Sequence, residues 1–448
     1  MEFIDFVVML TVYFATGIYA WKLFRDNPRI PTFCYVWLAS VVILLSGAIY
    51  HQITGIRASY VDGPGVIHWL TWREYGNAML AATVGIVSIT LGHHWAVRRE
   101  WQTPIPEFID SRALDAEHLG RWALLLLLGG FIPLAATGIL NPITLLGALV
   151  HGRALHGMAV YLYSAGTYFS FFNLFATLVP FGAAATAILL WGGRRPAMLL
   201  TITAFLALLL FLSGTRSSAA AILAPFVVIP RYMGNQKLFR KLAAIGIIGG
   251  FVLFSVQLVY RSVGFEKVQL GRALTKAAPL QVVDGNQLSW TGQAMRDYGN
   301  LFPSLDGSSY LAVVVGPFPR IFWHSKPDGY SKVNADNLDY PFGTTMTSGW
   351  MGEAYANFGW FGIPIVGLIA GVLMGILDVF IRRSGAFAMA VFLPLQMRWG
   401  FWVRGDSVFS LDAWMFGFLV LILLLAIFGP ATSRATLAGA APGADSIA

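Results

Sequence analysis

Residues 359–381 read GWFGIPIVGLIAGVLMGILDVFI, a predominantly apolar run as long as one membrane-spanning helix, which needs about 20 residues. Similar runs recur along the 448-residue chain, which is 57% hydrophobic and only 12% charged, and this composition excludes an ordinary water-soluble protein. Because the runs are continuous rather than alternating, and only helices or closed barrels satisfy their backbone in a bilayer, the spans should be helical. The sequence therefore predicts an all-α polytopic membrane protein.

About eleven runs are long enough to be spans or short membrane helices. They lie at 3–24, 32–53, 77–97, 121–140, 161–191, 197–212, 217–230, 242–262, 359–381, 385–403 and 411–428. The chain thus divides into N-terminal transmembrane helices (1–262, about eight), a loop (263–358), C-terminal transmembrane helices (359–428, about three) and a low-complexity tail (429–448) that is expected to be disordered.

Lysine and arginine gather in alternate connections, and such connections mark the cytoplasmic side. The clusters are Lys22/Arg25/Arg29, Arg98/Arg99/Arg112, Arg194/Arg195, Arg231/Lys237/Arg240/Lys241, Arg382/Arg383 and Arg434. The formal net charge of +8 therefore reflects topology rather than nucleic-acid binding. The alternation predicts that the N-terminus and the 263–358 loop lie outside, and that the C-terminal tail lies in the cytoplasm.

The 263–358 loop contains glycine, proline, charged and aromatic residues between two apolar helices. Its segment 317–327, PFPRIFWHSKP, is rich in rings, whereas disordered chains are poor in aromatics. Prolines recur along the loop at the spacing of helix breaks. The loop is therefore predicted to be an ordered, helical extramembrane cap over a cavity open to the outer leaflet.

Four polar segments fall at the outer ends of spans, and each contributes an arginine. A single arginine at a helix end can simply extend its head to the interface. Several on one face favour an anionic ligand, because the guanidinium fork matches phosphate oxygens, and a diphosphate is the anion met at a membrane surface. The candidate diphosphate ligands are Arg216, Arg261, Arg320, Lys326 and Arg404.

Residues 348–362, SGWMGEAYANFGWFG, lead from the cap directly into a span. Glu353 would lie within two turns of the outer membrane boundary, where partial burial suits a carboxylate to act as a general base. The alternative is that Glu353 forms an ion pair with a neighbouring arginine. The glycines of this segment permit close approach by another helix or a lipid chain.

Motifs for metal or nucleotide binding are missing from the sequence. Cys34 is the only cysteine, and there is neither a Gly-x-x-x-x-Gly-Lys-Ser/Thr loop nor an Asp-x-Asp pair. His93 and His94 are adjacent, so they point in different directions on a helix, and they are expected near the inner face as packing or interfacial residues. No metal and no cofactor are expected.

Four short motifs occur in a characteristic order: SGTRS (213–217), PRIFWHSKP (319–327), GEAYANFGWFG (352–362) and RGD (404–406). Together they resemble the bacterial Wzy-type O-antigen and exopolysaccharide polymerases. The resemblance implies a GT-C-like arrangement of helices with a large periplasmic loop. It also implies a glycosyltransferase that needs neither a metal nor a nucleotide, in the bacterial inner membrane with its active site facing the periplasm.

In such an enzyme the growing glycan moves from undecaprenyl diphosphate to the non-reducing sugar of a new lipid-linked repeat unit. The partners would be these undecaprenyl-diphosphate-linked glycans, membrane lipids and, as a further candidate, a chain-length regulator protein, with no nucleic acid. Glu353 is the first candidate for the base and His324 the second. Aromatic residues are candidates for stacking on sugars, with core packing as the competing role; they are Trp323, Tyr330 and Tyr355.

Two other functions stay open at this point. A ligase that transfers the finished glycan to the lipid A core would use the same arginines. A transporter or flippase is the non-enzymatic alternative, but transporters place their sites near the bilayer midplane, whereas these charges gather on one face.

Overall fold

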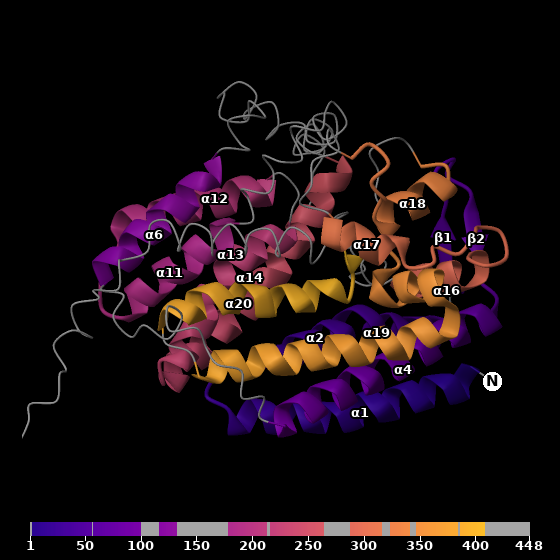
Figure 1. The fold of residues 1–448 in the computed structure, drawn as a ribbon, viewed down its shortest axis with the longest axis horizontal. Helices are drawn as coiled ribbons and strands as arrows, with labels where there is room; N and C mark the ends of the chain where they lie inside the picture. The colour runs from indigo at the N-terminus through magenta and orange to yellow at the C-terminus, as the bar shows by residue number, and fades with distance from the viewer. Residues whose placement is uncertain are drawn as a thin grey trace, which may run out of the picture.

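The computed structural model describes residues 2–55, 57–99, 116–131, 178–212, 216–263, 287–315, 323–340, 346–383 and 386–407. These residues are mostly helical (Figure 1). The expected span at 411–428 and the tail at 429–448 lie outside the described residues. The elements in chain order are α1 (Glu2–Asp26), α2 (Thr32–Ser40), the π-helical turn η1 (Val41–Leu45), α3 (Ser46–Thr54), β1 (Ser59–Val61), β2 (Ile67–Trp69), α4 (Trp72–Arg98), α6 (Ala116–Gly129), α11 (Val179–Trp191), α12 (Ala197–Leu212), α13 (Arg216–Tyr232), α14 (Gln236–Val263), α16 (Gln287–Asp297), α17 (Ser308–Val315), α18 (Tyr330–Asn337), α19 (Gly349–Arg383) and α20 (Ala386–Trp402).

Among the described residues, four helices are long and apolar enough to cross a membrane: Phe3–Asp26, Thr32–Thr54, Trp72–Arg98 and Gly349–Arg382. Shorter apolar helices occur at Leu119–Gly129, Val179–Trp191, Ala197–Leu209 and Ala219–Tyr232. The protein is therefore a helical, multi-pass membrane protein. The total of about eleven spans stays a prediction.

Helices α4 and α19 pack closely because small residues line their contact. A Cβ atom added to Gly371 would lie 2.2 Å from the carbonyl oxygen of Ile89, and one added to Gly92 would lie 2.2 Å from that of Leu368. Gly375 similarly abuts Ala96. Without side chains at these positions the two backbones can approach closely, as small residues four apart allow in membrane helices.

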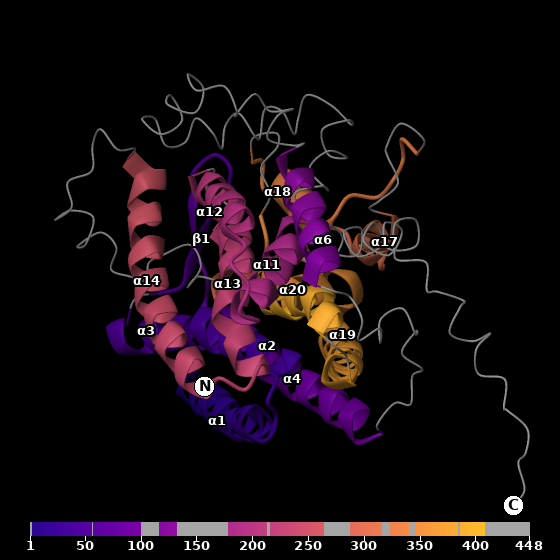
Figure 2. The ribbon, with the colours of Figure 1, turned by 90° about the vertical axis from the view of Figure 1, so that its left-hand side faces the viewer.

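Helices α1, α4 and α19 run in the same direction. Gly76 at the start of α4 lies against Asp5 of α1, whereas His93 near the end of α4 contacts Tyr19 of α1. The lysines and arginines that follow the three helices therefore gather at one end of the bundle. The cap helices α16 and α17 contact α19 at the opposite end, to the right in Figure 1. Helices α6, α11, α12 and α13 pack on one another as a second group (Figure 2).

Two apolar cores follow this division. One is shared by α1, α2, α4, α16 and α19, and includes Trp350 stacked on Trp402 with ring centroids 4.8 Å apart. The other is formed by α6, α11, α12, α13 and α20. The described parts of the cap, 287–315 and 323–340, are thus attached to the first core through α16.

Two of the boundaries that differ from the sequence expectation have a clear local cause. Helix α4 begins at Trp72 rather than at residue 77, because Thr71 and Glu74 form a capping box that starts the helix inside the polar segment. Helix α19 begins at Gly349, ten residues before the expected span, and is interrupted at Phe358 and Gly359. Gly359 has φ +60° and ψ −151°, a conformation that favours glycine, so the expected start of the span coincides with a kink.

The fold was expected to be all-α, but it also contains a short antiparallel hairpin formed by β1 and β2. The hairpin turn packs on the end of α18, where the Gly63 backbone nitrogen donates to the Leu338 carbonyl oxygen at 2.8 Å. A Cβ at Gly63 would lie 1.9 Å from the Asp339 carbonyl oxygen, so only glycine fits. The hairpin therefore joins the N-terminal helices to the cap.

Candidate functional site

A buried carboxylate lies where the cap meets the membrane helices. Glu353, in the first part of α19, is completely buried. Its Oε1 atom accepts a hydrogen bond from the Ser309 hydroxyl at 2.8 Å. Its Oε2 atom accepts two, from the backbone nitrogen and the hydroxyl of Ser407, both at 2.7 Å. Three segments that are distant in sequence, at 309, 353 and 407, therefore meet at one carboxylate.

Asn357 lies one turn after Glu353 on the same helix face and extends this network. Its side-chain nitrogen donates to the Ser309 hydroxyl and to the Glu353 carbonyl oxygen, both at 2.8 Å. Its side-chain oxygen accepts from the backbone nitrogen of Gly307 at 3.0 Å. Asn357 thereby fixes the start of α17 against α19.

A second buried carboxylate, Asp406, lies close enough to Glu353 for the two charges to interact. It accepts hydrogen bonds from the backbone nitrogen of Ser331 at 2.7 Å and from the Ser331 hydroxyl at 2.5 Å. Ser331 is in the first turn of α18, where a carboxylate satisfies free backbone donors and complements the helix dipole. The segment after α20 therefore holds both α18 and Glu353.

Tyr310 presents a hydroxyl to this acidic cluster. Its ring stacks on Phe358 with centroids 5.9 Å apart, and among the described residues its buried hydroxyl has no hydrogen-bond partner. Burial, with the charges of Glu353 and Asp406, raises the pKa of Tyr310 well above its ordinary value. The hydroxyl is thus a neutral donor without a partner among the described residues.

Residues 326–430 match the model of the family described as O-antigen polysaccharide polymerase Wzy. This match confirms the resemblance that the sequence motifs predicted. No curated protein and no solved structure matches the chain. Both carboxylates, Glu353 and Asp406, lie inside the Wzy-matched segment, whereas Ser309 and Tyr310 precede it and reach the same cluster through the fold.

The Wzy-matched segment also contains two of the aromatic residues expected to bind sugar. Tyr330 is completely buried, and its hydroxyl donates to the Ser348 hydroxyl at 2.7 Å. Tyr355 is half-buried and contacts Trp360 edge to face, with centroids 6.1 Å apart. The third expected residue, Trp323, precedes the segment and is exposed, as is the neighbouring His324. Their roles in sugar binding and catalysis stay predictions.

The structure locates two of the five expected diphosphate ligands. The Arg404 carbonyl oxygen accepts a hydrogen bond from the Thr347 hydroxyl at 2.5 Å, which places its backbone beside Thr347, two residues before Asp406 in the chain. Lys326 is half-buried in the cap. Arg216 and Arg261 lie on α13 and α14, but their side chains are outside the described part, and so is the whole of Arg320.

Sequence reasoning missed most residues of the cluster. Asp406 stood in the RGD motif without an assigned role, and Asn357 stood in the same motif as Glu353. The spacing of four residues between Glu353 and Asn357 is a signal that could have joined them, because it places both on one helix face. Ser309, Ser331 and Ser407 have no such signal. Among the described residues no group of three His, Cys, Asp or Glu side chains forms a metal site.

Proposed function

We propose that the protein polymerises lipid-linked oligosaccharide repeat units at the periplasmic face of the bacterial inner membrane. The growing glycan would move from undecaprenyl diphosphate to the non-reducing end of a new undecaprenyl-diphosphate-linked repeat unit. The proposal includes about eleven spans, a GT-C-like helix arrangement, the cap on the periplasmic side and a reaction that uses no metal. Membrane lipids and a chain-length regulator protein are the other proposed partners.

The observation that carries the proposal is the Wzy match over residues 326–430, because it coincides with the buried acidic cluster. Glu353, Asp406 and Arg404 belong to that segment, and they lie at the end of α19 opposite the arginines at 382–383. A polar site at one end of the bundle suits a substrate whose lipid lies in one leaflet and whose sugars lie in water.

In the proposed reaction, the bond between the anomeric carbon and the diphosphate oxygen breaks as the acceptor hydroxyl oxygen attacks that carbon. Undecaprenyl diphosphate leaves with the bonding electron pair, and the hydroxyl proton passes to the base. Each carboxylate oxygen can accept two hydrogen bonds. Glu353 Oε2 accepts two within the described residues, whereas Oε1 accepts one, which leaves Oε1 the oxygen able to receive the proton.

The remaining side chains fit the other needs of this transfer. Arg404, with Lys326, Arg216, Arg261 and Arg320, is proposed to neutralise the departing diphosphate. The Tyr310 hydroxyl would donate to an oxygen of the diphosphate or of the acceptor sugar. His324 is the second candidate for the base, and Trp323, Tyr330 and Tyr355 are the proposed sugar contacts.

The function is tested by glycan length in a strain whose copy of this gene is deleted and then restored. Polymerase activity predicts that the deletion removes long chains while single repeats still reach the lipid A core, and that the intact chain restores the long chains. Accumulation of free undecaprenyl-linked polymer would instead indicate a ligase. Long chains attached to the lipid A core in the deletion strain, as in the parent strain, would refute both functions.

A further inference from the structure

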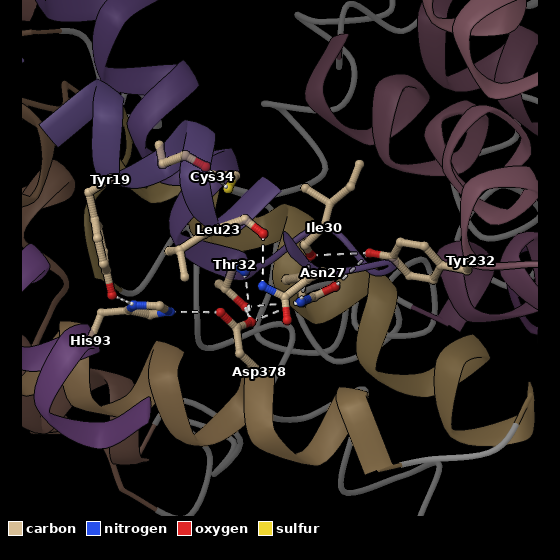
Figure 3. Close-up of polar contacts among 11 residues, drawn as sticks. Tyr19, Leu23, Asn27, Ile30, Thr32, Cys34, His93, Tyr232 and Asp378 are labelled. Atoms are coloured by element: carbon tan, nitrogen blue, oxygen red, sulfur yellow. Dashed lines mark hydrogen bonds and ion pairs between the residues drawn. The ribbon is translucent and has the colours of Figure 1, made fainter. Parts of the chain in front are cut away.

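A second buried polar network lies at the other end of α19 (Figure 3). Asp378 is buried and accepts hydrogen bonds from the backbone nitrogen of Thr32 at 2.7 Å, from the Thr32 hydroxyl and from the Gln396 side chain at 3.0 Å. The fourth donor is Nε2 of the completely buried His93, at 2.8 Å. Every part of this carboxylate therefore has a donor from the protein itself.

The imidazole of His93 is fixed from both sides. Because its Nε2 donates to the Asp378 carboxylate, Nδ1 of the neutral ring is an acceptor, and the Tyr19 hydroxyl lies 2.9 Å from it. The histidine was expected to be a packing or interfacial residue, but it joins α1, α4 and α19. The Asp378 carboxylate is thus bound by hydrogen-bond donors of the protein itself.

A small cleft opens beside this network, and its polar lining residues are Arg29, Arg382, Asn27, Gln396, His93 and Asp378, with five apolar residues completing the wall. The terminal nitrogen Nη1 of Arg29 is buried and has no hydrogen-bond partner among the described residues. Burial lowers the pKa of the Arg29 guanidinium, which means that its charge is poorly solvated. A desolvated cation in a cleft with a second arginine is a site for an anion.

We propose that this cleft binds a phosphate group, supplied either by an anionic lipid headgroup or by a free phosphate. Arg29 and Arg382 contribute the charge, and Asn27 supplies a neutral donor from the same cleft. Glu353 and Asp378 lie 25 residues apart along α19, and the 19 residues from the kink at Gly359 to Asp378 alone span about 28 Å at 1.5 Å per residue, close to the ~30 Å hydrocarbon thickness. The phosphate site is therefore distinct from the acidic cluster and lies at the Lys/Arg-rich end, where anionic lipids attract basic residues.

The test uses the purified full chain in detergent and native mass spectrometry with a short-chain phosphatidylglycerol. The matching diacylglycerol, which lacks the phosphate, is the comparison ligand. The unmodified chain should bind the phosphatidylglycerol and not the diacylglycerol. Arg29→Gln and Arg382→Gln should each weaken binding about tenfold, because each removes a charge-assisted contact. Arg25→Gln is the matched control, since Arg25 is exposed at the same end and pairs with Asp26.

Inorganic phosphate distinguishes the two sources. If millimolar phosphate displaces the phosphatidylglycerol, a free phosphate can occupy the site; if it does not, the lipid is the occupant. Arg382 is exposed, so Arg382→Gln should keep the fold even if Arg29→Gln does not. Binding of the diacylglycerol as tight as that of the phosphatidylglycerol, no binding of the phosphatidylglycerol, or equal binding by Arg382→Gln and Arg25→Gln would overturn the proposal.

Discussion

Replacing Tyr310 by phenylalanine removes one oxygen atom from the acidic cluster and leaves the ring stacked on Phe358. The hydroxyl has no partner among the described residues, and an unsatisfied buried polar group costs about 1–3 kcal/mol. Tyr310→Phe should therefore leave the free energy of unfolding unchanged or raise it, which means that the native state is as stable as before or more stable. If the hydroxyl binds the substrate, Tyr310→Phe should lose activity without losing stability.

The size of that loss follows from the proposed ligand. A hydrogen bond to a charged group contributes about 1.5–3 kcal/mol, so losing one to the departing diphosphate should slow the transfer roughly 10- to 150-fold. The control is Tyr330→Phe, which removes a hydroxyl that donates to Ser348 at 2.7 Å. That variant leaves a buried partner unsatisfied, so it should be destabilised by about 1–3 kcal/mol.

Two measurements separate these effects: glycan length in the complemented deletion strain, and thermal unfolding of the purified protein. We expect Tyr310→Phe to give short chains at an unchanged or raised Tm, and Tyr330→Phe to give a lower Tm. Long chains with Tyr310→Phe at ordinary protein levels would refute a substrate contact, and a lowered Tm would mean that the hydroxyl has a structural partner.

Three further predictions concern helix packing and chemistry. Gly371→Ala should be less stable than Gly250→Ala by about 1–3 kcal/mol in thermal unfolding. A Cβ at Gly371 would lie 2.2 Å from the α4 backbone, whereas a Cβ at Gly250 would have nothing within 4 Å. Equal stabilities of the two variants would contradict the close contact between α4 and α19. Glu353→Gln should reach the membrane but make only single-repeat product, while His324→Ala retains partial activity; the reverse outcome makes the histidine the base. Arg404→Lys keeps the charge without the guanidinium fork, so polymerisation should fall at near-normal protein levels. Full activity of this variant would mean that Arg404 only extends to the membrane interface and does not bind the diphosphate.

Sequence reasoning was most successful where the apolar pattern alone determines structure. The range 197–212 coincides with α12, and the run that starts at 359 coincides with the membrane half of α19 after its kink. Hydrophobic length is a local property, so a single sequence contains it. The early start of α4 escaped notice because Thr71 and Glu74 begin the helix among polar residues.

Contacts between distant residues could not be predicted in this way. His93 and Asp378 are 285 positions apart, and the sequence around neither residue indicates that the two are in contact. Likewise, Glu353 was selected by its position at the end of a span, but its partners Ser309 and Ser407 are small residues with no periodicity. Pairing of this kind depends on the packing of α4 against α19 and of the cap on both.

The triple junction at Glu353 also constrains how the chain is made. Of the three residues, Ser309 is synthesised first and Ser407 last, and Ser407 reaches Glu353 only after α20 has been made. Until then the carboxylate has no partner for Oε2, and the end of the cap that contains α17 and α18 is held by only part of its contacts. Because domains fold as units during synthesis, the cap should acquire its final form only when residue 407 has left the ribosome and reached it. A chain that stops before residue 406 should consequently insert its earlier helices yet remain sensitive to proteolysis in the cap.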